Sequence, residues 1–181
     1  PRHYFLDTAL DRIAYEDRAF PIAEGQTISQ PYTVAFQTQL LQVKPGEKIL
    51  EIGTGSAYQA SVLAELGAQV YTIERQKALF DSNKHFVLKA KYPQIKFFYG
   101  DGFEGLPTFA PFDKIIITAA APFIPPKLVD QMKIGAMMVV PLDEGEKQRM
   151  HRLTKLPDGS LKEEAFTAFS FVPMLTGRTG G

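Results

Sequence analysis

The chain has no cysteine among its 181 residues, which excludes disulfide bonds, thiol catalysis and thiolate metal sites. It has no net charge either, because 20 basic and 20 acidic residues balance, so neither a nucleic-acid surface nor a polybasic membrane contact is indicated. No apolar stretch is as long as a membrane span, and no signal peptide opens the sequence. These absences favour a cytoplasmic, cofactor-using enzyme that acts on neither nucleic acid nor membranes.

Ligands for a metal ion are also scarce. His3, His85 and His151 are far apart and lack the spacing of a zinc site, so we expect no metal. The hydrophobic content of 45% is enough to bury one substantial core, and no change of composition marks a second domain.

Residues 48–66, KILEIGTGSAYQASVLAEL, have the pattern of a strand, a glycine turn and a helix. The letters ILEI indicate a buried strand, and ASVLAEL indicates a helix with an apolar face. Gly53 and Gly55 lie in the turn between them. Because neither carries a Cβ, the backbone can turn tightly there and approach a ligand closely.

An acidic residue stands at an informative distance from this turn. Glu74 follows a second apolar strand, residues 69–73, and lies 19 residues beyond Gly55. Nucleotide-binding folds keep a carboxylate at this spacing, where it accepts hydrogen bonds from both ribose hydroxyls. Gly53, Gly55 and Glu74 therefore predict a nucleoside-cofactor pocket at the carboxyl ends of two parallel strands.

Two features favour S-adenosylmethionine over a dinucleotide in that pocket. The turn, GTGSAY, lacks the third glycine of a pyrophosphate-binding loop. Glu51, near the end of the first strand, would repel a pyrophosphate but suits the ammonium and sulfonium charges of S-adenosylmethionine. A nicotinamide-dependent oxidoreductase remains the alternative from these residues.

The rest of the pattern predicts an α/β fold, a doubly wound, mostly parallel sheet. Residues 1–28 are irregular, and Ser29 is the expected N-cap of a helix over residues 29–42. Further helices are predicted at 77–91 and 125–132, and strands at 95–99, 113–118 and 136–141. The turn PDGS joins two final strands, 149–156 and 161–171, into an antiparallel hairpin that a dehydrogenase would not have.

These motifs resemble the protein-L-isoaspartate O-methyltransferase family over nearly the whole chain. The stretches that carry the resemblance are GQTISQPYTVA, EIGTGSAYQ, GDGFEGLPTFAPFDKIIITAAAPFIP and QMKIGAMMVVPL. The resemblance implies the class I methyltransferase type of sheet in a single methyltransferase domain. Within it, residues 1–42 would form a substrate-side segment and residues 43–181 the cofactor-binding core. The family usually carries a further helical segment ahead of Pro1, which we expect here too.

The resemblance also assigns residues to the cofactor. It implies that Asp101 and Gly102 line the adenine site, and that Glu51, Gly53, Gly55 and Glu74 hold the rest of S-adenosylmethionine. Ala57 departs from the pattern, because the family usually has glycine there. We expect its methyl group to narrow the cofactor pocket.

On the substrate side, the resemblance makes the Ser29 hydroxyl the active-site group, which would donate a hydrogen bond to the substrate carboxylate. Thr27 and Ile28, with the segment from Ile22 to Gly25, would complete the lip of the substrate site. An N-cap role for Ser29 can coexist with this one, because a helix N-terminus can point at a carboxylate.

The implied reaction transfers a methyl group to the free α-carboxyl of L-isoaspartyl residues in damaged proteins and peptides, leaving S-adenosylhomocysteine. The ester would then cyclise to a succinimide that reopens partly to aspartate. A carboxyl with a pKa of about 3–4 is already ionised at neutral pH, so no general base is needed. Alignment and desolvation would supply the catalysis. A class I methyltransferase of a small molecule is the second alternative, and we expect a monomer.

Overall fold

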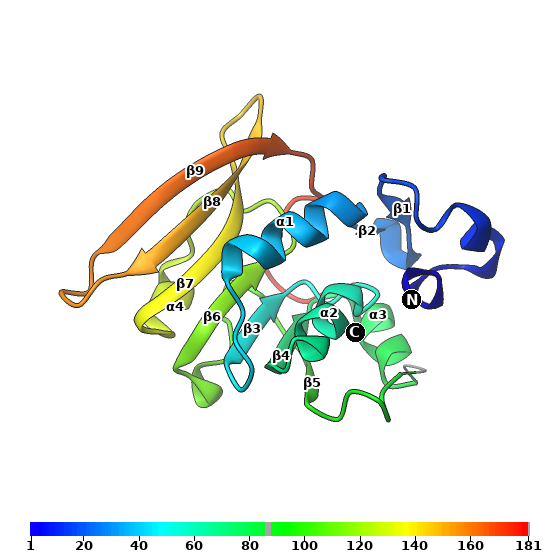
Figure 1. Ribbon diagram of the computed structural model, residues 1–181, viewed down its shortest axis with the longest axis horizontal. Helices are drawn as coiled ribbons and strands as arrows, with labels where there is room; N and C mark the ends of the chain where they lie inside the picture. The colour runs from blue at the N-terminus through cyan, green and yellow to red at the C-terminus, as the bar shows by residue number, and fades with distance from the viewer. Residues whose placement is uncertain (86–87, 181) are drawn as a thin grey trace.

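The computed structural model describes residues 1–85 and 88–180, which are built around a seven-stranded sheet (Figure 1). The strand order is β5-β4-β3-β6-β7-β8-β9. The parallel strands are β3 (Lys48–Ile52), β4 (Gln69–Glu74), β5 (Ile95–Tyr99), β6 (Phe112–Ile117) and β7 (Met132–Asp143). The final hairpin, β8 (Gln148–Lys155) and β9 (Leu161–Phe169), pairs antiparallel, and β8 also runs against β7. The predicted sheet and its closing hairpin are confirmed.

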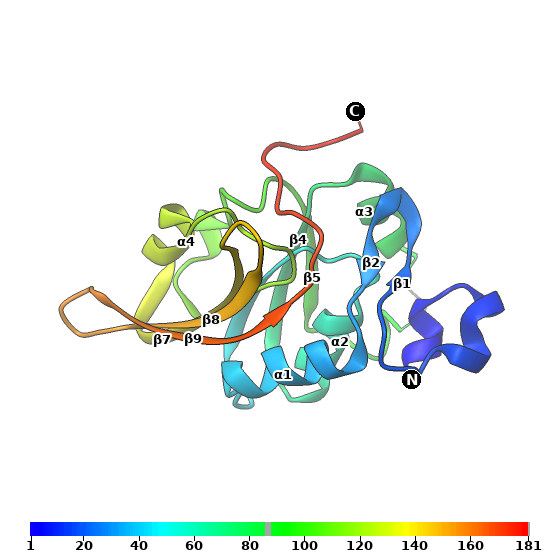
Figure 2. The ribbon, with the colours of Figure 1, turned by 90° about the horizontal axis from the view of Figure 1, so that it is seen from above.

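Helices cover both faces of the sheet (Figure 2). Helices α1 (Pro31–Leu41) and α2 (Tyr58–Glu65) pack on one face, whereas the short α4 (Pro126–Asp130) packs on the other. Helix α3 (Lys77–Asn83) contacts β4 and β5. The described residues also form short 3-10 helices, which are η1 (Arg2–Phe5), η2 (Thr8–Ile13), η3 (Ala23–Gly25) and η4 (Pro107–Phe109).

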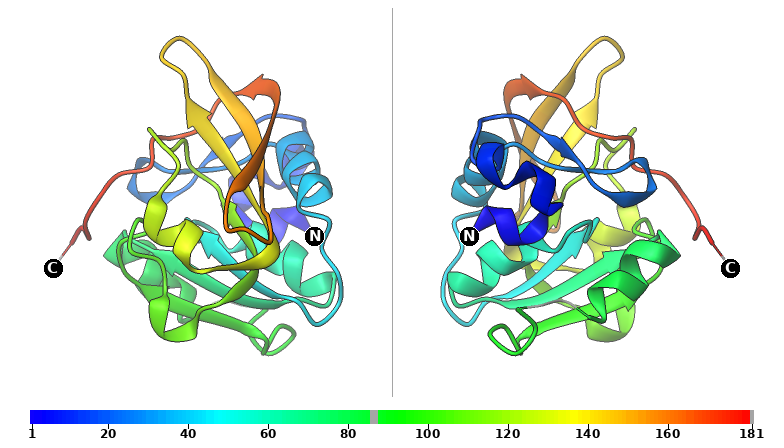
Figure 3. Two further views of the ribbon diagram at one scale, coloured as in Figure 1. Left: turned by 90° about the vertical axis from the view of Figure 1, so that its left-hand side faces the viewer. Right: turned by 90° about the vertical axis from the view of Figure 1, so that its right-hand side faces the viewer.

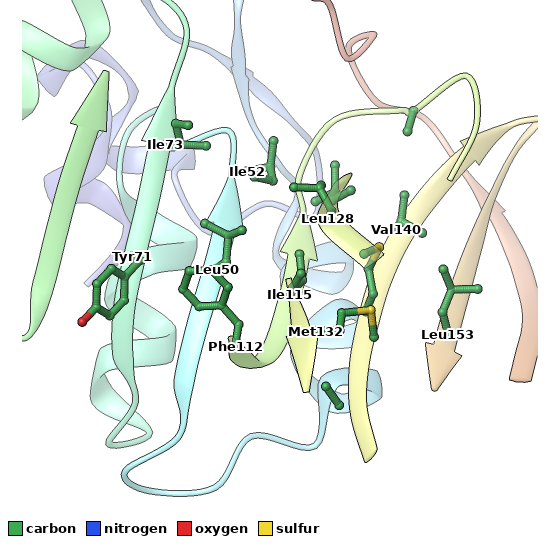
Figure 4. Close-up of a cluster of buried hydrophobic side chains, with 14 of the residues drawn as sticks. Leu50, Ile52, Tyr71, Ile73, Phe112, Ile115, Leu128, Met132, Val140 and Leu153 are labelled. Atoms are coloured by element: carbon green, nitrogen blue, oxygen red, sulfur yellow. The ribbon is translucent and has the colours of Figure 1, made fainter. Parts of the chain in front are cut away.

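Alternation along the strands divides the core between the two faces. Leu50 and Ile52 of β3 belong to the cluster on the α4 face, which Figure 4 shows with Leu128 of α4. Ile49 of β3 belongs to the cluster under α1 and α2. The face of Ile49 is also that of Glu51, so this carboxyl side chain enters the apolar layer between the sheet and the helices.

The N-terminal segment lies over the end of the sheet at which the parallel strands finish (Figure 3). A small antiparallel hairpin, β1 (Phe20–Pro21) and β2 (Thr27–Ile28), leads from this segment into α1. The first two turns of α1 are anchored to the sheet by Gln37, whose Nε2 donates to the Ile117 carbonyl at the end of β6 (2.9 Å). Residues directly before α1 are thereby held at the sheet's carboxyl edge.

The expected N-cap role of Ser29 is wrong. Helix α1 begins at Pro31, and Gln30, which occupies the cap position, makes no side-chain cap bond. The cap comes from a distant residue: Asp17 Oδ1 accepts the Tyr32 backbone N–H at 2.8 Å. The structure therefore leaves the side chain of Ser29 free of the capping task.

The predicted helix over residues 77–91 is also too long. Helix α3 ends at Asn83, and residues 84–85 and 88–91 form turns, while the part of the prediction at residues 86 and 87 lies outside the described residues. Before β5 begins, Tyr92 is buried and its hydroxyl donates to Glu65 Oε1 (2.5 Å).

Capping from a distance gives a testable expectation. Asp17→Ala should lower the free energy of unfolding by about 1 kcal/mol, because the Tyr32 N–H loses its acceptor. Asp17→Asn should lose much less, since asparagine caps nearly as well. Urea denaturation measures both, with Glu16→Ala as the neighbouring control. Equal stability of Asp17→Ala and the wild type would exclude the cap.

Candidate active site

Two cavities open at the carboxyl ends of β3, β4 and β6. The first, which we call the Glu74 cavity, is lined by Gln26, Thr27, Ile52, Gly53, Gly55, Ile73, Glu74, Arg75, Gln76, Gly102, Thr118, Ala119 and Val172 to Leu175. The second, the Ser29 cavity, is lined by Thr27, Ile28, Ser29, Val34, Gly53, Thr54, Gly55, Ser56, Tyr58, Gln59 and Thr118. Thr27, Gly53, Gly55 and Thr118 belong to both, so the cavities meet at the glycine turn.

Glu74 is the carboxylate of the first cavity. Its side chain is 95% buried, and each oxygen accepts one backbone N–H: Oε2 from Gly55 at 2.9 Å and Oε1 from Gln76 at 2.8 Å. A carboxylate offers about four lone-pair sites, so each oxygen keeps capacity for a further donor. The spacing of 19 residues found in the sequence thus corresponds to direct contact between the turn and Glu74.

The glycine turn forms a floor without side chains between the cavities. Gly53 has φ of 93°, and a Cβ added to it would meet Thr118 Oγ1 at 2.5 Å. That hydroxyl donates to the carbonyls of Ile52 and Gly53, at 2.9 and 2.7 Å. A bare backbone floor beside a carboxylate acceptor fits a nucleoside with ribose hydroxyls, so these residues suit S-adenosylmethionine.

Glu51 takes a different place from the one expected. It is fully buried, lines neither cavity, and accepts the Thr72 hydroxyl at Oε2 (2.5 Å), while Thr72 also contacts the Thr54 hydroxyl at 2.6 Å. Its other oxygen, Oε1, has no partner among the described residues. Burial and, to a smaller extent, the nearby Glu74 raise the pKa of Glu51 to about 8, although the hydrogen bond from Thr72 lowers it.

The charge expected at the turn is therefore absent at neutral pH. A carboxyl with a pKa of about 8 is mostly protonated at pH 7, so Glu51 offers no full negative charge to a cofactor cation. A contact between Glu51 and the cofactor stays a prediction, because Glu51 lines neither cavity in the structure.

Ser29 lies in the wall of the second cavity, between β2 and α1. Its side chain is partly exposed, and no hydrogen bond involves its hydroxyl within residues 1–85 and 88–180. The hydroxyl is thus available to a ligand. Beside it, Gln59 has a buried Oε1 without a partner in the described part of the chain, while its Nε2 donates to the Thr38 hydroxyl (3.0 Å).

The other expected substrate residues are divided. Thr27 and Ile28 line the Ser29 cavity, as the lip of the site requires. Ile22 lies on the far side of Gly55, in a separate hollow between the N-terminal segment and α3. Gly25 lines neither of the two cavities and occupies the η3 turn between β1 and β2 with φ of 64°.

Asp101 and Gly102 follow β5 and differ in their access to the first cavity. Gly102 lines it, and a Cβ at this position would meet Ile52 Cγ2 at 2.4 Å, so only glycine fits. Asp101 does not line it; its Oδ2 accepts the Gly177 N–H at 2.6 Å and its Oδ1 accepts the Phe103 N–H at 2.9 Å. The structure thus gives Asp101 the task of holding the C-terminal segment.

Sequence reasoning missed that C-terminal segment as a wall of the site. After β9, the chain crosses the ends of the parallel strands, and residues 172–175 line the Glu74 cavity. Backbone bonds fix it there, among them Met174 N to the Ala120 carbonyl at 2.7 Å. Irregular backbone without periodicity carries no sequence signal for this placement.

Ala57 also differs from expectation. Its methyl group does not line either cavity; it is fully buried in the cluster under α1 and α2. The residue has φ of 68° at the start of α2, a left-handed conformation in which glycine would be less strained. The family glycine at this place is explained by backbone conformation rather than by room for the cofactor.

In residues 1–85 and 88–180, no group of three or more ligating side chains could hold a metal ion. None of the helices in the described part of the chain is both long and apolar enough to cross a membrane.

The fold and the glycine-floored site define a class I methyltransferase that uses S-adenosylmethionine. Residues 1–179 match the family described as Protein-L-isoaspartate(D-aspartate) O-methyltransferase. The Protein-L-isoaspartate O-methyltransferase of Cytophaga hutchinsonii is 52% identical over 180 residues, which are 99% of this chain and 80% of that protein. This chain therefore belongs to the protein-L-isoaspartate O-methyltransferase family.

Solved structures agree. One described as a protein-L-isoaspartate O-methyltransferase has a TM-score of 0.84 at 26% identity, covering 100% of this chain and 58% of the longer one. A putative protein-L-isoaspartate O-methyltransferase from Plasmodium falciparum, in complex with S-adenosyl-L-homocysteine, has a TM-score of 0.82 at 24% identity, covering 96% and 85%. The second comparison supports the fold alone.

The raised pKa of Glu51 predicts a pH dependence of stability. The group has an ordinary pKa of 4.5 in the unfolded chain and about 8 in the folded one, so the folded state binds more protons between these values. Its contribution to stability is complete below pH 4.5 and is lost as pH rises through 8. Glu51→Gln, which mimics the protonated form, should gain stability relative to the wild type across this window.

Denaturation midpoints of the two proteins from pH 5 to pH 9 measure the effect. The difference should grow with pH and level off above pH 8. Parallel pH profiles would show that Glu51 is ionised in the folded protein.

Proposed function

We propose that the two cavities divide the family reaction between its substrates, with S-adenosylmethionine in the Glu74 cavity and an isoaspartyl α-carboxylate in the Ser29 cavity. As a member of its family, the chain transfers a methyl group from S-adenosylmethionine to isoaspartyl residues of proteins. The observation that carries the division is the shared wall of Thr27, Gly53, Gly55 and Thr118. Ligands on its two sides would meet above the glycine turn.

On the cofactor side, S-adenosylmethionine supplies a methyl group made electrophilic by its sulfonium. Glu74 would accept hydrogen bonds from the ribose hydroxyls through the lone pairs that are not used by the N–H groups of Gly55 and Gln76. Gly53 and Gly55 keep the floor free of side chains, so that the backbone reaches the ligand. Gly102 borders the adenine end, with Asp101 acting behind it by fixing the C-terminal segment.

On the substrate side, the Ser29 hydroxyl donates a hydrogen bond to the carboxylate. No base is needed to activate this nucleophile, because the carboxylate is ionised at neutral pH. Ile28 and Val34 contribute an apolar wall beside Ser29. Alignment of the carboxylate with the methyl group would provide much of the rate, and water excluded by the two bound ligands would strengthen the attraction between anion and cation.

The wider organisation follows the same division. Residues 1–42 supply Thr27, Ile28 and Ser29 to the substrate side, and residues 43–181 supply the cofactor floor and Glu74, within a single methyltransferase domain. We place the enzyme in the cytoplasm as a monomer without nucleic-acid or membrane contacts, which its balanced charge supports. The methyl ester would proceed through a succinimide toward aspartate, which makes the reaction one of protein repair.

A transfer assay with S-adenosylmethionine tritiated in its methyl group tests this function. An isoaspartyl peptide should become labelled with a base-labile ester, whereas the peptide of the same sequence with ordinary aspartate should not. Equal labelling of both peptides, or of neither, would contradict the proposed substrate.

The role of Ser29 gives the sharpest variant. Ser29→Ala should lower kcat/KM for the isoaspartyl peptide roughly tenfold or more, equivalent to at least ~1.4 kcal/mol, because the carboxylate loses a donor. Its stability should match the wild type, because Asp17 and not Ser29 caps α1. Ser29→Asp should be still less active, since two carboxylates repel each other. A fully active Ser29→Asp enzyme would refute the assignment.

Glu74 is tested through the product. Glu74→Ala should weaken binding of S-adenosylhomocysteine by about 1–3 kcal/mol, because the ribose hydroxyls lose a charged acceptor. The Gly55 and Gln76 N–H groups lose their acceptor too, so folding must be checked by circular dichroism. Isothermal titration measures the affinity, with Glu146→Ala as control, because Glu146 is exposed and lies outside both cavities. Unchanged affinity in a folded variant would remove Glu74 from the cofactor site.

A further inference from the structure

An arginine close behind the substrate side is almost wholly buried. The side chain of Arg2 is 99% buried, although it belongs to the short η1 turn at the edge of the fold. Its guanidinium donates to three backbone carbonyls: Nε to Ala14 at 2.7 Å, Nη1 to Ser29 at 2.7 Å and Nη2 to Arg18 at 3.4 Å. Arg2 thereby connects η1 to the residues before β1 and to Ser29, which lines the Ser29 cavity.

Burying this charge is costly, and no ion pair offsets the cost. All three acceptors are neutral carbonyls, and no carboxylate forms an ion pair with Arg2 within the described residues. Asp17 contributes attraction from a distance, but its oxygens are bonded to the Tyr32 N–H and to Gln30. Burial lowers the pKa of Arg2, yet an arginine keeps its charge at neutral pH.

Two residues that contact the guanidinium of Arg2 also line the Ser29 cavity. Arg2 bonds the carbonyl of Ser29, and its guanidinium carbon lies 5.3 Å from the centre of the Tyr58 ring. Ser29 and Tyr58 both line that cavity. A positive charge without an ion-pair partner among the described residues therefore lies directly behind the wall on which we place the substrate carboxylate.

We propose that Arg2 is a positioning residue for the isoaspartyl substrate: it holds Ser29 through its carbonyl and attracts the substrate carboxylate through its charge. The proposal rests on the substrate site assigned above. The hydrogen bond fixes the backbone that carries the Ser29 hydroxyl, so it affects alignment in the reaction. The charge acts across a poorly solvated wall, where it is weakly screened, so it affects binding of the anion.

A purely structural role for Arg2 in holding the N-terminal residues would have other consequences. Arg2 would then support both cavities through the stability of the fold, and its loss would weaken the binding of the cofactor and of the peptide together. If Arg2 instead positions Ser29, its loss should affect the peptide substrate and spare cofactor binding, because no residue of the Glu74 cavity is bonded to Arg2 among the described residues.

Two variants at Arg2 separate its charge from its geometry. Arg2→Gln removes the charge, whereas Arg2→Lys keeps the charge but replaces the planar guanidinium by a single ammonium nitrogen, which cannot reproduce the bonds of Nε, Nη1 and Nη2 to three separate carbonyls. For Arg2→Gln we expect kcat/KM with the isoaspartyl peptide to fall at least tenfold and KM to rise. For Arg2→Lys we expect kcat to fall with KM near the wild-type value. Affinity for S-adenosylhomocysteine should stay within twofold for both.

Arg18→Gln is the matched control, because this arginine lies in the same segment with an exposed side chain paired to Glu16, and Arg2 touches only its carbonyl. It should keep wild-type kinetics. Wild-type kcat/KM in folded Arg2→Gln, or parallel loss of cofactor and peptide binding, would overturn the proposal, as would failure of both Arg2 variants to fold. An inactive wild type would contradict the proposed function instead.

Discussion

The carboxylate of Glu74 ties the glycine turn after β3 to the end of β4, and the geometry of the site depends on this tie. A turn that approaches a ligand without side chains exposes backbone N–H groups, which need acceptors when buried. Glu74 accepts the Gly55 N–H with one oxygen, and the Ile73 carbonyl accepts the Gly53 N–H at 3.0 Å. Parallel pairing of Ile52 with Ile73 brings these groups together. The same carboxylate can then bind a ligand because it is already held in place.

The substrate side is held by contacts that are distant in sequence. Gln37 anchors α1 to the end of β6, Asp17 caps the helix, and Arg2 bonds the carbonyl of Ser29. Each contact links the N-terminal 42 residues to the sheet or to one another across 15 or more positions. Ser29, which precedes α1, is therefore positioned by distant residues, and its hydroxyl makes no bond among the described residues.

The sequence predicted what local patterns determine. Apolar runs located the strands, and the spacing between Gly55 and Glu74 indicated a pocket that both residues line in the structure. Ser29 was mistaken for a cap because the competing acceptor, Asp17, lies 12 residues earlier and only the fold brings it to Tyr32. The charge of Glu51 was overestimated because burial depends on the helices above the strand. The placement of the C-terminal segment depends on scattered bonds to distant residues, such as those to Asp101 and Ala120, which leave no periodic pattern in the sequence.

The ionisable groups around the site have unequal environments, and this inequality explains how one small region can hold a cation and an anion together. Burial raises the pKa of Glu51 to about 8, with a smaller contribution from the nearby Glu74 on the neighbouring strand, so Glu51 is mostly protonated at neutral pH. Glu74, bonded to two N–H groups, is the acceptor that faces the first cavity. Arg2 lies behind the second cavity, where its guanidinium donates to three neutral backbone carbonyls and forms no ion pair among the described residues. A carboxylate therefore borders the Glu74 cavity and an arginine lies behind the Ser29 cavity, an arrangement of charge that suits the cationic cofactor and the anionic substrate that we propose for them.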